Sequence, residues 1–156
     1  MNRLLSIMAL FGAIVFAAPA HASEWWFVSL SGDSPDRRVL FIDTESAVSD
    51  GTNRIKVWSY RIYEKINKDG RRKEKFQTRF DCSARTMTLL ALNLYGNNDR
   101  FIDSLRWDSY EQEVRDVVPD TIGEEQWTFV CRNSSSTALK IDNSPEEFAA
   151  TIFRGR

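Results

Sequence analysis

Histidine and cysteine are scarce in this chain of 156 residues, which has one histidine, His21, and two cysteines, Cys82 and Cys131. Because His21 lies in a predicted signal peptide, the rest of the chain has no imidazole to activate a serine or a thiol, or to bind zinc. We therefore expect no catalytic residues, no metal and no cofactor.

Long apolar runs are also missing, except at the N-terminus. Residues 1–22 contain Arg3, an apolar run from Leu4 to Ala18, and Ala20-His21-Ala22, the small-x-small pattern that signal peptidase cleaves. The run has about fifteen residues, fewer than the roughly twenty that span a membrane. We predict cleavage after Ala22 and export to the periplasm or the medium. We expect no lipid anchor and no transmembrane segment.

The two cysteines lie far apart in the chain. In a small exported domain such a pair usually forms a disulfide, because the compartment is oxidising. A Cys82–Cys131 bond would close a loop of about fifty residues and stabilise the fold by roughly 4 kcal/mol. We therefore predict a structural disulfide between Cys82 and Cys131.

Neither sign of charge is in excess, since 21 basic residues stand against 22 acidic ones. One segment, residues 64–76, is locally basic around the turn Asn67–Gly70. Its cations form a candidate binding site, which we call the basic hairpin: Lys65, Lys68, Arg71, Arg72, Lys73 and Lys75. Such a cluster could hold phosphate or sulfate groups of a polyanion; the alternative is a solvated hairpin. No aromatic residue lies between the charges, so no specific nucleic acid is expected.

Short segments rich in aromatic and β-branched residues predict strands, and turn residues separate them. The predicted strands cover residues 25–30, 38–44, 54–63, 73–82, 86–95 and 101–107. Their short connections favour antiparallel pairing, because parallel strands need long crossovers. The sequence thus predicts an antiparallel sheet of about six strands.

Two helices are predicted after this sheet. Thr121 and Glu124 fit a capping box, after which Trp127, Val130 and Cys131 fall on one helical stripe. A second, short helix is predicted from Pro145 to Phe153. The fold class is therefore α+β, with a domain over residues 23–132 and a Ser-rich linker and short C-terminal helix over residues 133–156.

Five short motifs carry a resemblance to the surface-adhesin protein E family, over roughly residues 25–132. They are FIDTES at 41–46, Val57-Trp58, FDC at 80–82, VVPDT at 117–121 and FVC at 129–131. The resemblance implies a small secreted domain with an antiparallel sheet, a packed helix and a bridge between the two matching cysteines. Some members of the family bind host extracellular proteins and are often lipid-anchored, whereas this chain lacks an anchor cysteine.

These observations favour a secreted or periplasmic, non-enzymatic binding module. Its expected partner is an extracellular-matrix or envelope polyanion or protein. One alternative is a small cell-envelope hydrolase that uses carboxylates, and another is a structural envelope protein without a ligand. A second candidate surface is the exposed side of the sheet, where we expect Arg61 and Arg79 on neighbouring strands.

Overall fold

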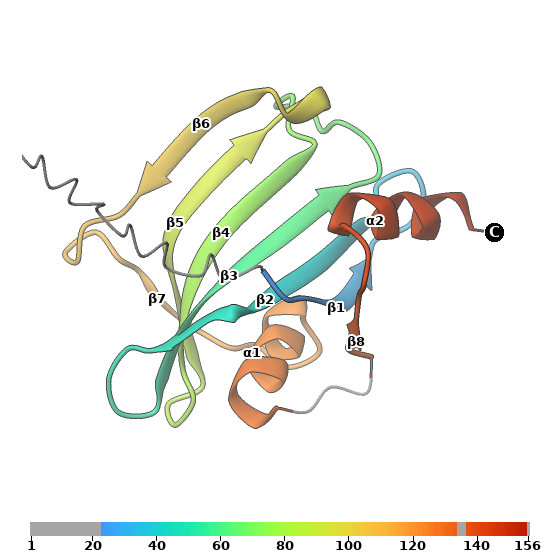
Figure 1. The fold of residues 1–156 in the computed structure, drawn as a ribbon. Coiled ribbons are helices and arrows are strands. Elements are labelled where there is room, and N and C mark those ends of the chain that lie inside the picture. Colours follow the sequence, from blue (N-terminus) through green and yellow to red (C-terminus); the bar gives the residue numbers. More distant parts are fainter. Residues whose placement is uncertain (1–22, 134–136, 156) are drawn as a thin grey trace, which may run out of the picture.

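The structure is a computed structural model that describes residues 23–133 and 137–155, and Figure 1 shows how their elements are arranged. Within these ranges no helix is both long and apolar enough to cross a membrane. The predicted signal peptide over residues 1–22, and residues 134–136 of the predicted linker, lie outside the described residues.

One antiparallel sheet of eight strands organises the molecule, in the order β6-β5-β4-β3-β2-β1-β8, with β7 paired to β5. The strands are β1 (Trp25–Ser31), β2 (Arg38–Ser49), β3 (Arg54–Tyr63), β4 (Lys73–Asp81), β5 (Thr86–Tyr95), β6 (Phe101–Arg106), β7 (Val114–Asp116) and β8 (Leu139–Lys140). The predicted α+β fold with its antiparallel sheet is confirmed. The sequence did not predict β7 and β8, because three and two residues are too short to show an alternation.

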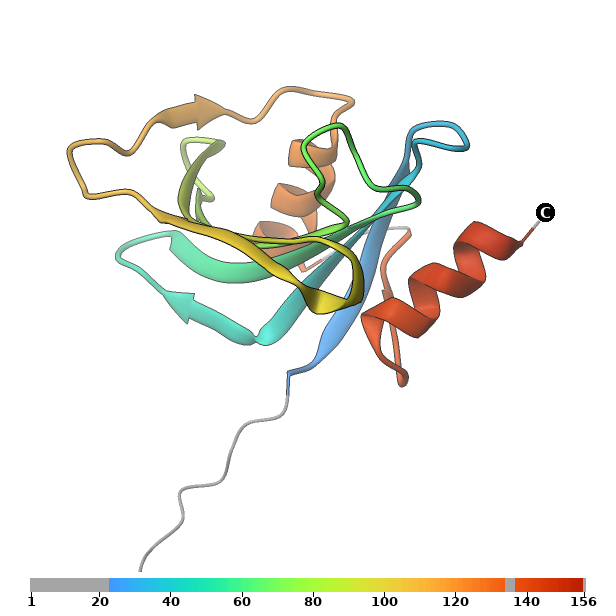
Figure 2. The same cartoon turned by 90° about the horizontal axis from the view of Figure 1, so that it is seen from above.

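The sheet has two differently covered sides, because successive residues of a strand point to opposite faces. Leu40 and Ile42 of β2 belong to one core cluster, and Val39 and Phe41 belong to another. The first cluster packs on helix α1 (Ile122–Arg132), inside the curve of the sheet, and the second packs on helix α2 (Pro145–Arg154), outside it (Figure 2). We call these sides the concave face and the convex face.

Helix α1 begins at Ile122 with Thr121 as its N-cap, as the sequence predicts. The Thr121 hydroxyl oxygen accepts a hydrogen bond from the Glu124 N–H at 3.4 Å. The predicted capping box is only half formed, because the Glu124 carboxylate accepts from the N–H of Asp120, at 2.9 Å, and not from Thr121. Asp120, which donates this hydrogen bond, has a positive φ of 60°.

The predicted disulfide between Cys82 and Cys131 is confirmed, with the two Cα atoms 5.3 Å apart. It ties α1 to the turn between β4 and β5. Next to it, Trp127 is buried against the sheet and donates its indole N–H to the carbonyl oxygen of Asp81 at 3.3 Å. Helix α1 is therefore held by a covalent bond and by apolar packing together.

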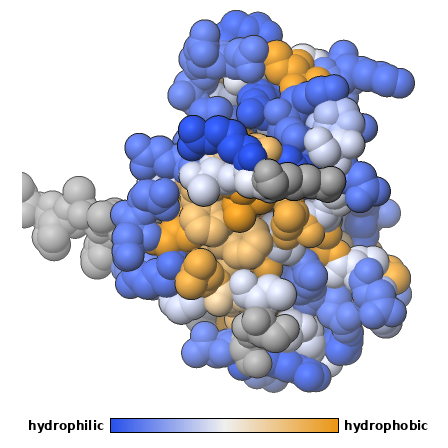
Figure 3. Space-filling model, turned by 90° about the vertical axis from the view of Figure 1, so that its right-hand side faces the viewer, coloured by the Kyte–Doolittle hydropathy of each residue, from blue (hydrophilic) through white to orange (hydrophobic). Residues whose placement is uncertain are grey.

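Helix α2 begins at Pro145, as predicted, and ends one residue after the predicted Phe153; its N-cap Ser144 forms a complete capping box with Glu147. Its Phe148 ring lies 5.4 Å from the Phe27 ring and 5.9 Å from the Phe41 ring, centre to centre. Figure 3, which views this side of the molecule, shows apolar side chains gathered in the middle of the face, with hydrophilic residues around them.

The C-terminal end of α2 is fastened by one side chain from the loop between β1 and β2. Arg37 is buried and donates hydrogen bonds to the carbonyl oxygens of Ile152, at 3.5 Å, and Phe153, at 2.6 Å. The same guanidinium forms an ion pair with Glu64 at 2.9 Å. Strand β8 also pairs with β1. The segment after residue 136 therefore contacts the sheet twice, at its edge through β8 and on its convex face through α2.

Candidate functional site

The basic hairpin has the predicted turn at its tip. The Asn67 side-chain oxygen accepts hydrogen bonds from the N–H groups of Asp69, at 3.1 Å, and Arg71, at 2.9 Å, and Gly70 has a φ of +77°. Lys65 and Lys68 are exposed at this tip.

The other four cations of the basic hairpin make contacts within the protein. Arg71 pairs with Asp69 at 2.7 Å, and the buried Lys73 contacts Asp99 and Glu146. The Arg72 guanidinium lies 5.8 Å from the centre of the Phe153 ring, and the Lys75 Nζ lies 4.8 Å from the centre of the Tyr60 ring. The six cations of the basic hairpin are therefore not one group: two are exposed at the tip, two form ion pairs, and two lie against aromatic rings. That the basic hairpin binds an anion stays a prediction.

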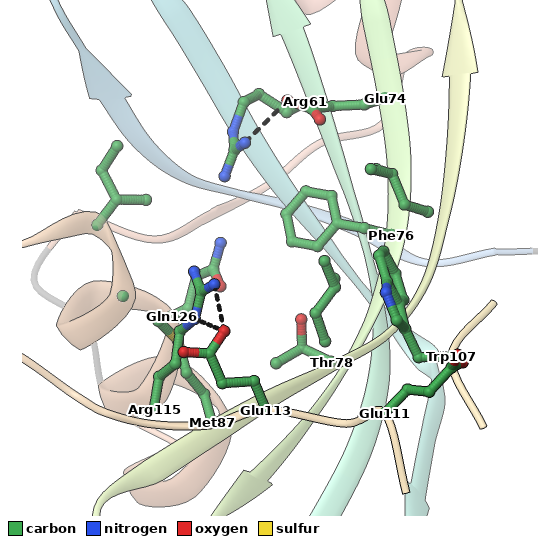
Figure 4. Close-up of a pocket in the computed structure, with 14 residues that line it drawn as sticks. Arg61, Glu74, Phe76, Thr78, Met87, Trp107, Glu111, Glu113, Arg115 and Gln126 are labelled. Atoms are coloured by element: carbon green, nitrogen blue, oxygen red, sulfur yellow. Dashed lines mark hydrogen bonds and ion pairs between the residues drawn. The ribbon is translucent and has the colours of Figure 1, made fainter. Parts of the chain in front are cut away.

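A cavity of about 390 Å³ opens on the concave face, between the first turn of α1, strands β3 to β5 and the segment that joins β6 to β7 (Figure 4). Much of its lining is apolar: Phe76, Met87, Leu89, Leu92, Trp107 and Ile122. This volume lies within the roughly 300–1,000 Å³ of typical ligand sites. The side chain of Leu89 is 37 % exposed, so part of the apolar lining is open to solvent.

Two Arg–Glu ion pairs border the cavity at opposite ends (Figure 4). At one end Arg61 donates to Glu74 at 2.8 Å, and its guanidinium lies 4.9 Å from the centre of the Phe76 ring. At the other end Arg115 pairs with Glu113 at 2.6 Å. The cavity therefore presents apolar walls between two polar ends.

The Arg61 end is buried more deeply than the Arg115 end. Glu74 is 4 % exposed and accepts hydrogen bonds from Arg61 and from the Tyr63 hydroxyl. Burial and the hydrogen bond to Glu74 raise the pKa of Tyr63, so this phenol stays protonated and donates. The Nε of Arg61 is buried and has no hydrogen-bond partner among the described residues.

The expected placement of Arg61 and Arg79 on one exposed side of the sheet is wrong, although the two residues do lie on neighbouring strands. Arg61 lies opposite Glu74 in the β3–β4 register, on the concave face, whereas Arg79 lies opposite Lys56, on the convex face. The two positions differ by an odd number of steps in this register, and an odd step changes the face.

Sequence reasoning missed the apolar lining of the cavity for a similar reason. The β4–β5 register shifts between Gln77 and Thr78, so that Leu89 lies opposite Thr78 and Leu92 lies opposite Phe76. Both leucines line the cavity although they are three residues apart. A strict alternation would put them on opposite faces, and only the bulge, which has no clear mark in the sequence, brings them together.

The family model of surface-adhesin protein E matches residues 27–132, which include all of β1 except its first two residues, and the whole of β2 to β7 and α1. The chain belongs to the surface-adhesin protein E family. In this family member, the matched range includes the cavity, the basic hairpin and both cysteines, whereas β8 and α2 follow it. No curated protein matches the chain.

Solved structures of Haemophilus influenzae protein E resemble this adhesin-family fold. Crystal form II has 17 % identity and a TM-score of 0.47, with 60 % of this chain and 80 % of that chain covered. A second structure of the protein has 14 % identity and a TM-score of 0.45, covering 69 % and 84 %. Protein E from a non-typeable Haemophilus influenzae has 13 % identity and a TM-score of 0.44, covering 75 % and 80 %.

Acidic and sulfur side chains are spread over this adhesin-family domain. In the part of the chain that the structure describes, no three His, Cys, Asp or Glu residues are grouped so that they could hold a metal ion.

Proposed function

We propose that this protein is an exported, non-enzymatic binding module that takes an apolar segment of a partner protein into the cavity on its concave face. Membership of a surface-adhesin family supports a binding role. The observation that carries the assignment of the site is the cavity of about 390 Å³, with its apolar lining and its two Arg–Glu pairs.

The chemistry of the lining fits a protein segment. Leu89, Leu92 and Trp107 offer apolar surface to one or two side chains of a partner, and burying such surface is worth about 25 cal/mol per Å². The Arg61–Glu74 and Arg115–Glu113 pairs offer donors and acceptors to the polar groups that flank such a side chain. An apolar centre with a polar border is the usual composition of a protein interface.

The carboxylate-dependent hydrolase is less well supported. Glu74, Glu111 and Glu113 all line the cavity, and acid–base chemistry needs two carboxyl groups that face one substrate. However, the buried Glu74 carboxylate accepts hydrogen bonds from Arg61 and Tyr63, and the Glu113 carboxylate accepts them from Arg115. These contacts favour binding over catalysis at the cavity.

Export is the second part of the proposal. The disulfide between Cys82 and Cys131 fits an oxidising compartment, and the family is one of surface adhesins. We expect the mature protein to begin at Ser23, as the signal pattern predicts. Intact mass spectrometry of protein from the periplasm and from the medium measures both the first residue and the compartment.

A matched pair of leucine variants tests the assignment of the cavity. Leu89→Glu places a carboxylate in the lining, while Leu30→Glu makes the same change at a residue of similar exposure, 44 %, in β1 and outside the cavity. Binding to a panel of immobilised extracellular-matrix proteins is measured by surface plasmon resonance. We expect Leu89→Glu to weaken binding about tenfold or more, because a bound partner would bury its charge without a counter-charge, and Leu30→Glu to leave binding unchanged. Equal effects of the two changes would refute the cavity as the binding site.

A further inference from the structure

The convex face has an open half that the proposed binding at the cavity does not use. Helix α2 packs on β1, β2 and β3, and in the described part of the chain no helix lies over β4, β5 and β6 (Figure 1). Cross-strand register places Trp58 next to Gln77, which lies opposite Ala91, and Ala91 lies opposite Arg106. The neighbouring row runs from Tyr60 through Lys75 and Asn93 to Ser104.

We call the polar and aromatic part of these two rows the open convex surface. It consists of Trp58, Lys75, Gln77, Asn93 and Arg106. Neighbouring strands lie about 4.8 Å apart, so this surface spans roughly 14 Å from β3 to β6. Ala91, between Gln77 and Arg106 in one row, is buried and adds no exposed surface of its own.

Two cations of this surface, Lys75 and Arg106, form no ion pair with any described residue. Nearby, Asp50 pairs with Arg79 and Lys56, and the Glu146 carboxylate accepts from the Tyr60 hydroxyl and pairs with Lys73. Asp43 lies opposite Trp58 in the register, and one of its oxygens accepts the Glu24 N–H at 2.9 Å. Lys75 and Arg106 are therefore the cations of this surface that an anionic ligand can reach.

The remaining groups of the open convex surface are those that recognise sugars. Trp58 is half-buried, and its ring contacts no other aromatic ring among the described residues, so its exposed part can lie against the apolar C–H side of a pyranose. The side-chain amide of Gln77 can donate to and accept from hydroxyl groups, and that of Asn93, whose Oδ1 already accepts from the Ser104 hydroxyl at 2.7 Å, can donate to them. Arg106 can bind a carboxylate or a sulfate with two parallel hydrogen bonds.

We propose that the open convex surface binds a linear anionic polysaccharide, with Trp58 against a sugar ring and Lys75 and Arg106 on its carboxylate or sulfate groups. A single-stranded nucleic acid fits less well, because successive bases need successive stacking rings. Toward β5 and β6, two further rings, Tyr95 and Phe101, pack on each other with their centres 6.0 Å apart.

Heparin, a sulfated polysaccharide, is the probe for the first experiment, and binding is followed by intrinsic tryptophan fluorescence at low salt. The double variant Lys75→Ser/Arg106→Ser is compared with Lys65→Ser/Lys68→Ser, which removes the same charge from the tip of the basic hairpin. We expect the convex pair to lose affinity about tenfold or more, a change of about 1.4 kcal/mol, and the tip pair to lose less than threefold. Loss of affinity in the tip pair alone would overturn the proposal in favour of the basic hairpin.

A second pair of variants tests the aromatic contact. In isothermal titration calorimetry, which needs no tryptophan signal, Trp58→Ala should weaken heparin binding about tenfold, whereas Tyr110→Ala, at an 82 % exposed ring outside both surfaces, should leave it unchanged. Circular dichroism checks both folds. Arg106→Ser alone provides a second measurement if Trp58→Ala does not fold, because Arg106 is exposed and its removal disturbs no packing.

Two further outcomes would refute the proposal. One is the absence of any heparin binding by the wild-type protein at low salt. The other is binding of single-stranded DNA at least as tight as that of heparin and lost in the same convex variants, which would assign the surface to nucleic acid. Neutral dextran serves as the control polymer and should not bind, because it offers nothing to Lys75 and Arg106.

Discussion

The two faces of the sheet hold their helices by different means. On the concave face, α1 is joined to the sheet by the Cys82–Cys131 bond and by the buried Trp127. On the convex face, α2 depends on half-buried aromatic rings and on polar contacts that reach Glu146 and the helix C-terminus. The comparison shows that the part matched by the family model is fastened covalently, whereas the helix beyond it is fastened by contacts that single substitutions can remove.

Removing the disulfide should have the largest effect. We expect Cys82→Ser/Cys131→Ser to lose up to about 4 kcal/mol of unfolding free energy, because the unfolded chain is no longer restricted by a closed loop. Thermal unfolding followed by circular dichroism measures the loss, with the wild-type protein under reducing conditions as a second test. An unchanged melting temperature in both would mean that apolar packing alone holds α1.

Shortening the central aromatic ring of α2 should have the next largest effect. Phe148→Ala removes the ring contacts with Phe27 and Phe41. We expect a loss of about 2 kcal/mol in urea unfolding, less than the 3–5 kcal/mol of a fully buried phenylalanine because Phe148 is half-buried. Phe101→Ala, at a ring that is 56 % exposed, is the control and should lose clearly less. Equal losses would contradict the role of Phe148 as the anchor of α2.

A smaller effect is expected from the hydrogen bond between the helix and β3. Tyr60 is buried and its hydroxyl donates to Glu146, and burial together with this bond raises the pKa of the phenol, which therefore stays protonated. Tyr60→Phe should lose about 1 kcal/mol, the usual net value of one hydrogen bond. Tyr110→Phe, at an 82 % exposed residue, should be neutral.

The smallest effect concerns pH. Hydrogen bonds from Arg37 and Ser34 lower the pKa of Glu64 from 4.5 to about 2. A carboxyl group whose pKa is lower in the folded protein stabilises the fold above its unfolded pKa, and this contribution is lost as the pH falls from about 4.5 to about 2. The wild-type melting temperature should therefore drop more steeply over this range than that of Glu64→Gln. Parallel curves for the two proteins would argue against this contact.

The strands and helices could be predicted where the physical signal is local. The alternation of β4, the Ser144 cap with Pro145 and the Thr121 cap depend on neighbouring residues, so the sequence contains them. The disulfide followed from the number of cysteines and the expected compartment. Strand β8 depends instead on pairing with Trp26 and Phe27, more than a hundred residues earlier, which no local pattern in the sequence reveals.

The candidate sites were less predictable than the fold. The basic hairpin is continuous in sequence, but Lys73 and Lys75 follow each other on the strand at an interval of two and so reach the convex face, while Lys65 and Lys68 stay at the tip. The cavity combines β3, β4, β5, α1 and the segment after β6. Its assembly depends on a β-bulge and on the curvature of the sheet around α1, and both are properties of the folded chain (Figure 2).

The position of the disulfide also determines what a protease can do to this protein. The segment between Cys82 and Cys131 contains β5, β6 and β7 and most of α1. A cut inside it, for example next to the exposed Tyr110, leaves two pieces that are still covalently joined, so a nicked molecule keeps its mass apart from one added water until it is reduced. A cut in the exposed turn at residues 32–36 lies outside this loop and leaves β1 attached by non-covalent contacts alone. When a protease cuts the chain, the two ends of the same sheet therefore differ in how firmly the pieces stay attached.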